Sequence, residues 1–290
     1  MVDIKENLNN LIDTIKELPS LPIIVTQLIQ TINNEKSSAI DVAKIISNDQ
    51  AVTSKILRLV NSAYFGFQKK ITTVQHAISI LGFDTIRSIA LSLSVFEDIK
   101  GDLGLFNKES FWAHSIGTAV SSRELAKIIN MEDLSGTAFV CGLLHDIGKL
   151  IEFKYFINDF NNVVRLSAAQ NICFYEAEMQ IFRISHTEIG YKLGTKWDFP
   201  DEICIPILHH HTFTDKFNNY THNERILIAI VHLANIISKS RNFGYSGYEK
   251  IPDLLKEYYE VLQVNRQQLG VLIERTEDEF NKSLELLKII

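Results

Sequence analysis

Apolar residues recur along most of the chain at intervals of three and four, the spacing of one face of an α-helix. Leu8, Leu11, Ile12 and Ile15 form the first such face, which Leu18-Pro19 ends. The sequence lacks the alternation of apolar and polar residues, broken by hairpin turns, that is typical of β-strands. The pattern therefore predicts an all-α fold.

Capping residues divide this pattern into separate helices. In the first part of the chain, helices are expected to begin at Ser37 or Ser38, at Asn48-Asp49 and at Thr72 or Thr73, and Gly82 closes the last of them. Asn107 begins a long helix that runs through Leu125. Further helices are predicted over residues 134–146, 154–169, 173–182, 185–196, 200–210, 223–239, 251–260 and 266–289.

The helical pattern is interrupted at Lys100–Gly104, which contains two glycines and little periodicity. We interpret this segment as the boundary between two helical lobes. The prediction is an N-terminal helical lobe over residues 1–105, a second lobe over 106–240, and C-terminal helices over 241–290 that pack on the second lobe.

Composition and charge exclude several classes of protein. The chain has 290 residues with 29 Lys and Arg against 35 Asp and Glu, a formal net charge of −6. Such a chain lacks the basic surface that binds nucleic-acid phosphates, and no segment is apolar and long enough to cross a membrane. Because the charged N-terminus has no signal-peptide core, we expect a cytoplasmic protein whose three cysteines are reduced.

The sharpest local feature is an adjacent His145-Asp146 pair at the end of an apolar helix, followed by Gly148 and Lys149. Burying an imidazole or a carboxylate among leucines costs several kcal/mol unless the group is paired or ligated. Together these two groups suit Zn, Fe, Mn or Mg. The alternative is a histidine at a helix end beside a solvated aspartate.

Other histidines stand where helices would bring them together. His114 lies in the middle of a helix, His186 begins one, and His209–His211 end one. Each has a structural alternative, such as a bond to a backbone carbonyl or, at a helix C-terminus, an interaction with the helix dipole. The remaining histidines are expected to be structural or on the surface: His76, His222 and His232.

The order of these histidines and of the His-Asp pair along the chain resembles that of the HD superfamily of metal-dependent phosphohydrolases. One branch, with an HD-GYP motif, hydrolyses cyclic di-nucleotides at a centre of two or three metals. The resemblance implies a divalent cation (Fe, Mn, Zn or Mg) and a phosphate contact at Lys149, with Glu178 or Glu188 orienting a ligand histidine. The implied metal ligands are His114, His145, Asp146, His186, His210 and His211.

Two departures from the HD pattern concern metal binding. No acidic residue follows His211, where the chain continues with Thr212, and no Gly-Tyr-Pro segment is found there. The last metal-binding aspartate of the superfamily corresponds to Asn235. Because a neutral amide cannot bridge cations as a carboxylate does, two-metal chemistry is in question.

The N-terminal lobe is similar to the HDOD family, the HD-related output domain. The resemblance covers about residues 15–240, with Gln50 replacing a usual proline, and it implies that the second lobe is an HD-domain-like helical bundle. The motifs that carry it are Leu18-Pro-Ser-Leu-Pro22, Ile45-Ile-Ser-Asn-Asp49, Asn61-Ser-Ala-Tyr64-Phe-Gly66, Gly142-Leu-Leu-His-Asp-Ile-Gly148 and Trp197-Asp-Phe-Pro200.

The resemblance implies a signal-transduction regulatory module that acts through protein–protein contacts with signalling proteins and without catalysis. The alternative is a metal-dependent phosphohydrolase or cyclic di-nucleotide phosphodiesterase of HD type, in which the ion activates a water molecule. The motifs that begin at Leu18 and Asn61 serve either local packing or a partner-binding surface.

Overall fold

The structure, a computed structural model, describes residues 31, 38–48, 50–61, 70–82, 86, 107–197, 199–212, 217–245, 247, 250–251 and 253–287. Over these residues it contains α-helices, two short 3-10 helices and no strand, which confirms the predicted all-α fold. The motif 18–22, residues 62–66 and the predicted boundary 100–104 lie outside the described residues.

The chain divides into two compact units, which are described separately. The first comprises Met1–Gly101 and Lys282–Ile290, and the second comprises Asp102–Asn281. The second unit therefore includes most of the segment 241–290, and the finer lobe boundaries stay a prediction.

In the first unit, three described helices pack on one another: α3 (Ala39–Asn48), α4 (Gln50–Val60) and α5 (Val74–Leu81). Asn61 joins the end of α4 to the segment before α5. Its amide nitrogen donates to the carbonyl oxygens of Leu57 (2.7 Å) and Ile71 (2.5 Å), and its side-chain oxygen accepts from the Ile71 N–H (2.6 Å). This part of the Asn61 motif thus has a local structural role.

The caps of α5 follow from residue type, as expected. The Thr73 hydroxyl accepts from the His76 N–H at 3.1 Å, and Gly82 ends the helix with a φ of 83°. Glycine adopts this conformation without the steric penalty of a side chain. One of the two alternatives, Thr73, is therefore the cap.

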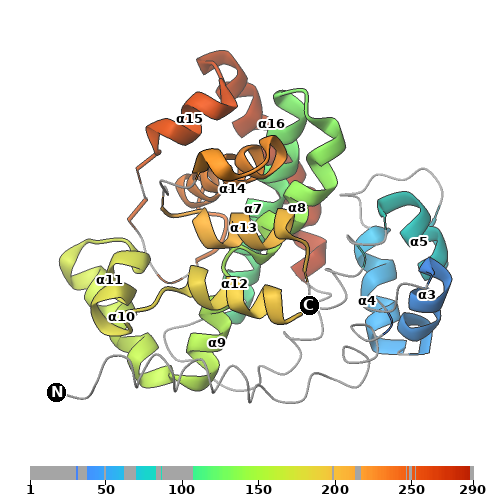
Figure 1. The fold of residues 1–290 in the computed structure, drawn as a ribbon, viewed down its shortest axis with the longest axis horizontal. Helices are drawn as coiled ribbons and strands as arrows, with labels where there is room; N and C mark the ends of the chain where they lie inside the picture. Colours follow the sequence, from blue (N-terminus) through green and yellow to red (C-terminus); the bar gives the residue numbers. More distant parts are fainter. Residues whose placement is uncertain are drawn as a thin grey trace. The chain divides into compact units, whose positions relative to one another are not determined.

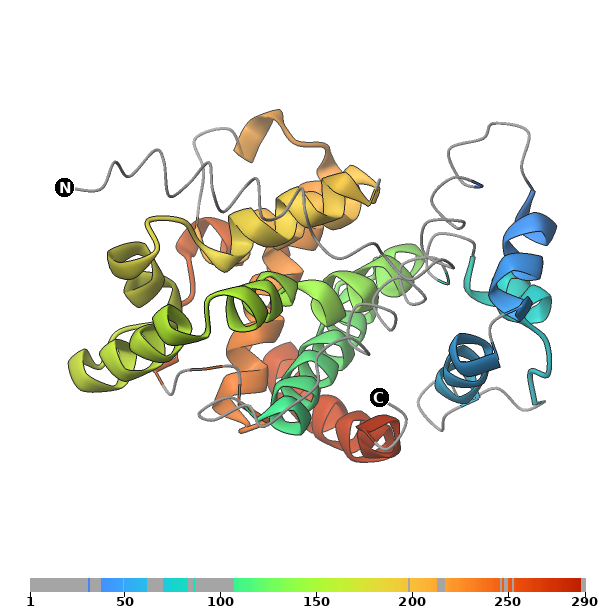
Figure 2. The same cartoon turned by 90° about the horizontal axis from the view of Figure 1, so that it is seen from below.

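The centre of the second unit is formed by α7 (Lys108–Ile128), α8 (Ser135–Leu144) and α14 (His222–Ser240), which lie side by side (Figures 1 and 2). Asn107 caps α7, since its side-chain oxygen accepts from the Ser110 N–H at 2.8 Å. Gly142 lets α8 approach α7 closely, because a Cβ there would lie 2.7 Å from the backbone of α7. This close packing places His114 of α7 near the end of α8.

The remaining helices surround this centre. α12 packs on α9 and α13, α10 packs on α11, and α15 packs on α14. Their bounds are η1 (Glu132–Leu134), α9 (Ile147–Tyr155), α10 (Ile157–Gln170), α11 (Phe174–Ile181), α12 (His186–Lys196), α13 (Asp201–His209), η2 (Phe217–Asn219), α15 (Lys256–Leu262) and α16 (Arg266–Leu287).

The predicted helix 134–146 ends at Leu144, and α9 is a separate helix that the sequence analysis did not predict. Asp146, with φ −99° and ψ 12°, leaves helical geometry and turns the chain into α9. The apolar pattern continues across this turn, so periodicity alone does not reveal the break.

One stretch, Glu132–Tyr155, has the length and composition of a membrane span. However, 83% of its most apolar window is buried inside the second unit. A core helix has the same properties, so this stretch is only weak evidence for a span.

Gly148 provides a test of how closely α9 and α12 must pack. A Cβ at this position would overlap the backbone carbonyl of His186. We expect Gly148→Ala to lower the free energy of unfolding by at least about 1–3 kcal/mol, the range of overpacking, as measured by urea denaturation and circular dichroism.

The matched control is Gly270→Ala in α16, where a Cβ would meet nothing within 4 Å. Because alanine favours helix over glycine, this change should be neutral or stabilise by up to about 1 kcal/mol. Equal effects of the two substitutions would contradict the packing argument.

Candidate metal centre

The structure brings all six predicted ligand residues together in the second unit. They form two groups that share Asp146, and within each group one ligand atom per residue lies within 4.8 Å of the others. The first group is Asp146, His186, His210 and His211, and the second is His114, His145 and Asp146. That these residues bind a metal stays a prediction.

The ligand residues come mostly from helix ends. His145 follows the last residue of α8, Asp146 precedes α9, and His186 is the first residue of α12. His210 follows α13 directly. Only His114 lies in the middle of a helix, α7. Helix ends that meet in the core thus bring together residues that are far apart in the sequence.

One oxygen of Asp146 faces the first group. Its Oδ1 lies 3.1 Å from His186 Nε2 and 3.7 Å from His210 Nε2, and these two nitrogens lie 3.4 Å apart. We call Asp146 Oδ1 with His186, His210 and His211 the Oδ1 half-site.

The other oxygen faces the second group and a lysine. Asp146 Oδ2 lies 3.4 Å from His145 Nε2 and 3.7 Å from His114 Nε2. The ammonium of Lys149 lies nearest, 2.7 Å from Oδ2. We call Asp146 Oδ2 with His114 and His145 the Oδ2 half-site.

Two of the histidines are held in the same way at the ends of their helices. Nδ1 of His145 lies 2.8 Å from the carbonyl oxygen of Gly142, and Nδ1 of His210 lies 2.8 Å from that of Ile207. A carbonyl oxygen only accepts, so each Nδ1 carries the proton. Each Nε2 therefore presents a lone pair toward Asp146, as a metal ligand does.

His186 is oriented by Glu178, one of the two glutamates expected to do so. Its Nδ1 donates to Glu178 Oε2 at 2.7 Å, and its backbone N–H donates to the same oxygen at 3.3 Å. Glu188 instead forms a capping box with Ser185 at the start of α12. With Nδ1 as the donor, His186 Nε2 carries a lone pair and lies 3.4 Å from His210 Nε2.

Burial sets the charge states of the centre. Burial alone would raise the pKa of the Asp146 carboxyl, but its polar and positively charged surroundings, with the Lys149 ammonium nearest, outweigh burial and lower this pKa well below its usual range. Burial lowers the pKa of His145 to about 3. Burial also lowers the pKa values of three more imidazoles: His114, His210 and His211. A carboxylate therefore lies among neutral imidazoles.

Two buried glutamates adjoin the centre, where Glu178 contacts His186. Glu152 and Glu178 are both 0% exposed. Burial, followed by the neighbouring Glu152, raises the pKa of Glu178 well above its usual range, and burial raises that of Glu152 to about 8. Sequence reasoning missed Glu152, whose only signal is its position one helical turn after Lys149.

The donor geometry fits one cation at the Oδ1 half-site. Ligands about 2.1 Å from a tetrahedral ion lie about 3.4 Å from one another. The separations among Asp146 Oδ1, His186 Nε2 and His210 Nε2 are 3.1, 3.4 and 3.7 Å. His211 adds a buried Nε2 that has no hydrogen-bond partner among the described residues. Three imidazoles and one carboxylate are borderline ligands that favour Zn, Fe or Mn over Mg.

Helix α14 also contributes to the surroundings of the centre. The Ser238 hydroxyl lies 3.3 Å from His114 Nδ1, a contact that no sequence signal indicates. One turn earlier, the amide oxygen of Asn235 is buried without a hydrogen-bond partner among the described residues. His232, expected to be structural or exposed, is buried and bridges the His210 carbonyl and the Leu255 N–H.

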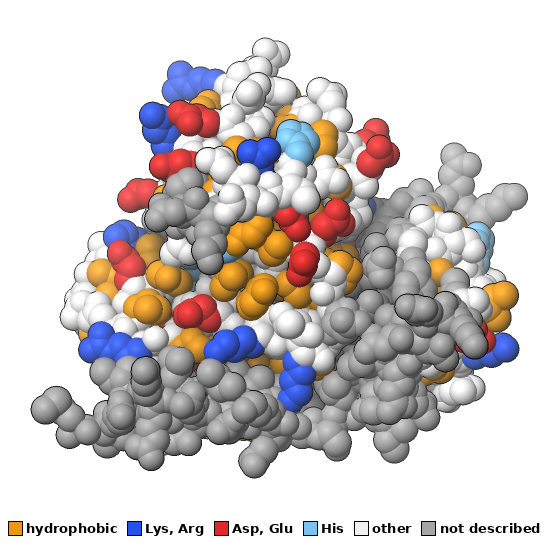
Figure 3. Space-filling view, in the orientation of Figure 1, with side chains coloured by type: hydrophobic (Ala, Val, Ile, Leu, Met, Phe, Trp, Pro, Cys, Tyr) orange, Lys and Arg blue, Asp and Glu red, His pale blue; other side chains and the backbone are white. Residues whose placement is uncertain are grey.

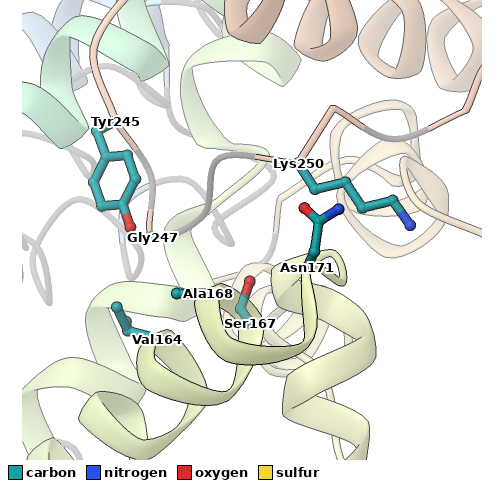
Figure 4. A pocket seen from close by; sticks show the side chains of 7 residues that line it. All are labelled: Val164, Ser167, Ala168, Asn171, Tyr245, Gly247 and Lys250. Carbon is teal, nitrogen blue, oxygen red and sulfur yellow. The ribbon is translucent and has the colours of Figure 1, made fainter.

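Among the described residues, a separate cavity of about 110 Å³ lies between the end of α10 and the segment after α14 (Figure 4). Lys250 is its only basic lining residue, and no acidic residue lines it. It therefore offers less chemistry than the His/Asp cluster. Its lining residues are Val164, Ser167, Ala168, Asn171, Tyr245, Gly247 and Lys250.

An all-α unit in which a His-Asp pair and four further histidines converge defines an HD-type helical protein. Comparison with protein families assigns it more narrowly, since the HDOD domain matches residues 18–213. The chain belongs to the HDOD family. The match ends before α14, so Asn235 and Ser238 lie beyond it.

Two proteins of known structure share this fold over almost their whole length. An HDOD domain protein of unknown function from Geobacter sulfurreducens is 26% identical, with a TM-score of 0.64 over 98% of this chain and 94% of that one. A Shewanella amazonensis SB2B protein, provisionally described as a phosphohydrolase, is 24% identical, with a TM-score of 0.69 over 96% and 97%.

An uncharacterized protein of Treponema pallidum (strain Nichols) is 24% identical over 268 residues. The alignment covers 92% of this chain but only 50% of that protein. The chain thus spans about half the length of this curated relative.

The raised pKa of Glu152 predicts a specific pH dependence. An acid that is protonated in the folded state up to about pH 8 contributes stability below its ordinary pKa of 4.5, and this contribution is lost as the pH rises toward 8. Glu152→Gln cannot ionise. Its unfolding free energy relative to wild type should therefore rise between pH 5 and 8, by at most about 1.4 kcal/mol per pH unit.

The measurement is urea unfolding at several pH values in the presence of a chelator. Glu257→Gln, on the exposed surface of α15, is the matched control and should show no such rise. If the difference in unfolding free energy between Glu152→Gln and wild type does not change with pH, Glu152 is not protonated in the folded state as proposed.

Proposed function

We propose that the chain is a regulatory module that acts through contacts with signalling proteins, and that its centre holds a divalent cation without catalysing a reaction. Membership of the HDOD family supports the regulatory part of the proposal. The observation that carries the non-catalytic part is the closure of the centre, since Asp146, His186 and His210 are each at most 1% exposed.

A catalytic metal needs an open coordination position that substrate or water can reach, whereas a structural metal is enclosed by four protein ligands. The Oδ1 half-site offers four such ligands, of which only His211 is partly exposed. With all four bound, the ion would have no free position. Asn235 adds to this argument, because a neutral amide supplies no bridging carboxylate on α14.

The cation would join three segments of the second unit: the turn before α9, the start of α12 and the end of α13. The Oδ1 half-site consists of imidazole lone pairs and a carboxylate oxygen and has no positive charge of its own. A bound cation would supply this charge. Because the folded state presents these ligands together, metal binding stabilises it. A change in occupancy could therefore alter the surface that a partner contacts.

Exposed apolar side chains support protein contacts. In Figure 3, hydrophobic side chains gather near the middle of the second unit, with acidic side chains beside them. Several large apolar residues of this unit are exposed: Ile157, Ile251, Leu254, Tyr259 and Val271. An exposed apolar patch such as the one in Figure 3 often marks a site of protein association.

The second candidate is a metal-dependent phosphohydrolase or cyclic di-nucleotide phosphodiesterase. The observation in its favour is that Asp146 is shared by two ligand groups, as a bridging carboxylate is in two-metal hydrolases. Lys149 was expected to contact phosphate in such an enzyme. Its side chain is 0% exposed and bound to Asp146, so that role requires the ammonium to leave its partner.

Metal removal tests the proposal. Protein stripped with a chelator should be less stable, and added Zn²⁺ should restore about 2.7 kcal/mol when free zinc is a hundred times the Kd, measured by thermal unfolding. Asp146→Asn keeps the side-chain shape but loses the charge, so its response to zinc should be much smaller.

The same samples should not hydrolyse bis(p-nitrophenyl) phosphate or a cyclic di-nucleotide with Zn²⁺, Mn²⁺ or Fe²⁺. Turnover by the wild-type protein that disappears in Asp146→Asn would overturn the non-catalytic proposal and favour the hydrolase. Crosslinking and mass spectrometry in the native host would identify the partner.

A further inference from the structure

The two oxygens of Asp146 have unlike surroundings. Oδ1 faces only imidazole nitrogens at its half-site, whereas Oδ2 also accepts a hydrogen bond from the Lys149 ammonium at 2.7 Å. One side of the carboxylate therefore already has a positive charge, and the other faces lone pairs.

Two contacts hold the Lys149 ammonium in this position. Besides its bond to Asp146, its Nζ lies 4.9 Å from the ring centroid of Phe174, a cation–π contact. Both side chains are fully buried. A buried ammonium that left its carboxylate would lose its compensation, so the pair is expected to persist.

This ammonium disfavours a metal ion at the Oδ2 half-site. An ion there would bind the same oxygen at about 2.1 Å, and the two cations would repel each other strongly in a buried environment. Asn235 adds no negative charge to the Oδ2 half-site, because its side chain is a neutral amide. It lies one turn before Ser238, which contacts His114 of this half-site.

We propose that each chain binds one divalent cation, at the Oδ1 half-site, and that the ammonium of Lys149 takes the place of a second cation on Asp146 Oδ2. This inference rests on the metal binding in the proposed function. It goes further by assigning the ion to one half-site and by giving Lys149 an internal role in place of a substrate contact.

His145 and His210 provide a matched pair of variants. Each follows the last residue of its helix, and each donates Nδ1–H to the carbonyl three residues earlier at 2.8 Å. They differ in the oxygen of Asp146 that they face.

We expect the chelator-stripped wild-type chain to bind one Zn²⁺, measured by isothermal titration and elemental analysis after desalting.

His210→Ala should weaken zinc binding by more than about 100-fold, beyond the usual effect of losing an outer-shell contact. His145→Ala should keep one zinc per chain with a Kd within about 10-fold of wild type. The reverse pattern, or two ions per wild-type chain, would overturn the inference and leave the proposed function intact. No zinc binding by the wild type would overturn both.

Lys149→Met removes the ammonium and keeps the length of the side chain. We expect this variant to bind two Mn²⁺ ions per chain, with electron paramagnetic resonance broadened by their proximity. Lys154→Met, on the same helix but beside Tyr155, is the control and should bind one. One ion in a folded Lys149→Met would overturn the role given to Lys149. If this variant does not fold, the histidine pair decides the inference.

Discussion

A carboxylate that is 1% exposed, at the turn between α8 and α9, is the group on which the second unit depends. A buried charge requires compensation, and Asp146 receives it from the Lys149 ammonium and from polar groups of separate segments. Those groups must in turn be oriented. The carbonyls of Gly142 and Ile207 and the carboxyl group of Glu178 orient the three histidines His145, His210 and His186.

This arrangement explains why the centre is built from helix ends. A helix end has backbone carbonyl or N–H groups without partners inside the helix, and these can hold an imidazole in one orientation. Gly148 lets the start of α9 lie against the His186 backbone. Dense packing and the hydrogen bonds therefore place the lone pairs with little freedom, and such preorganisation favours tight metal binding.

The burial of the centre also bears on its function. HD-type hydrolases need an ion that a phosphoester can reach, whereas in this chain five of the six candidate ligands are buried and an amide stands at Asn235. A closed centre that joins three segments is suited to setting the stability or conformation of a regulatory unit. Fold alone does not decide between these functions, so the argument rests on exposure, ligand number and charge.

The sequence by itself determined the helices and the ligand residue types. Periodicity predicted most helices, and Asn107, Thr73 and Ser185 cap theirs, because caps depend on residues within one turn. The resemblance to the HD superfamily named all six residues that converge. Only the tertiary structure decided that α9 is separate, that Glu178 rather than Glu188 orients His186, and that Lys149 binds Asp146. Lys149 and Asp146 are only three residues apart, but the burial that holds them together, like the choice of Glu178, comes from packing with helices distant in sequence. Local patterns carry no information on this packing.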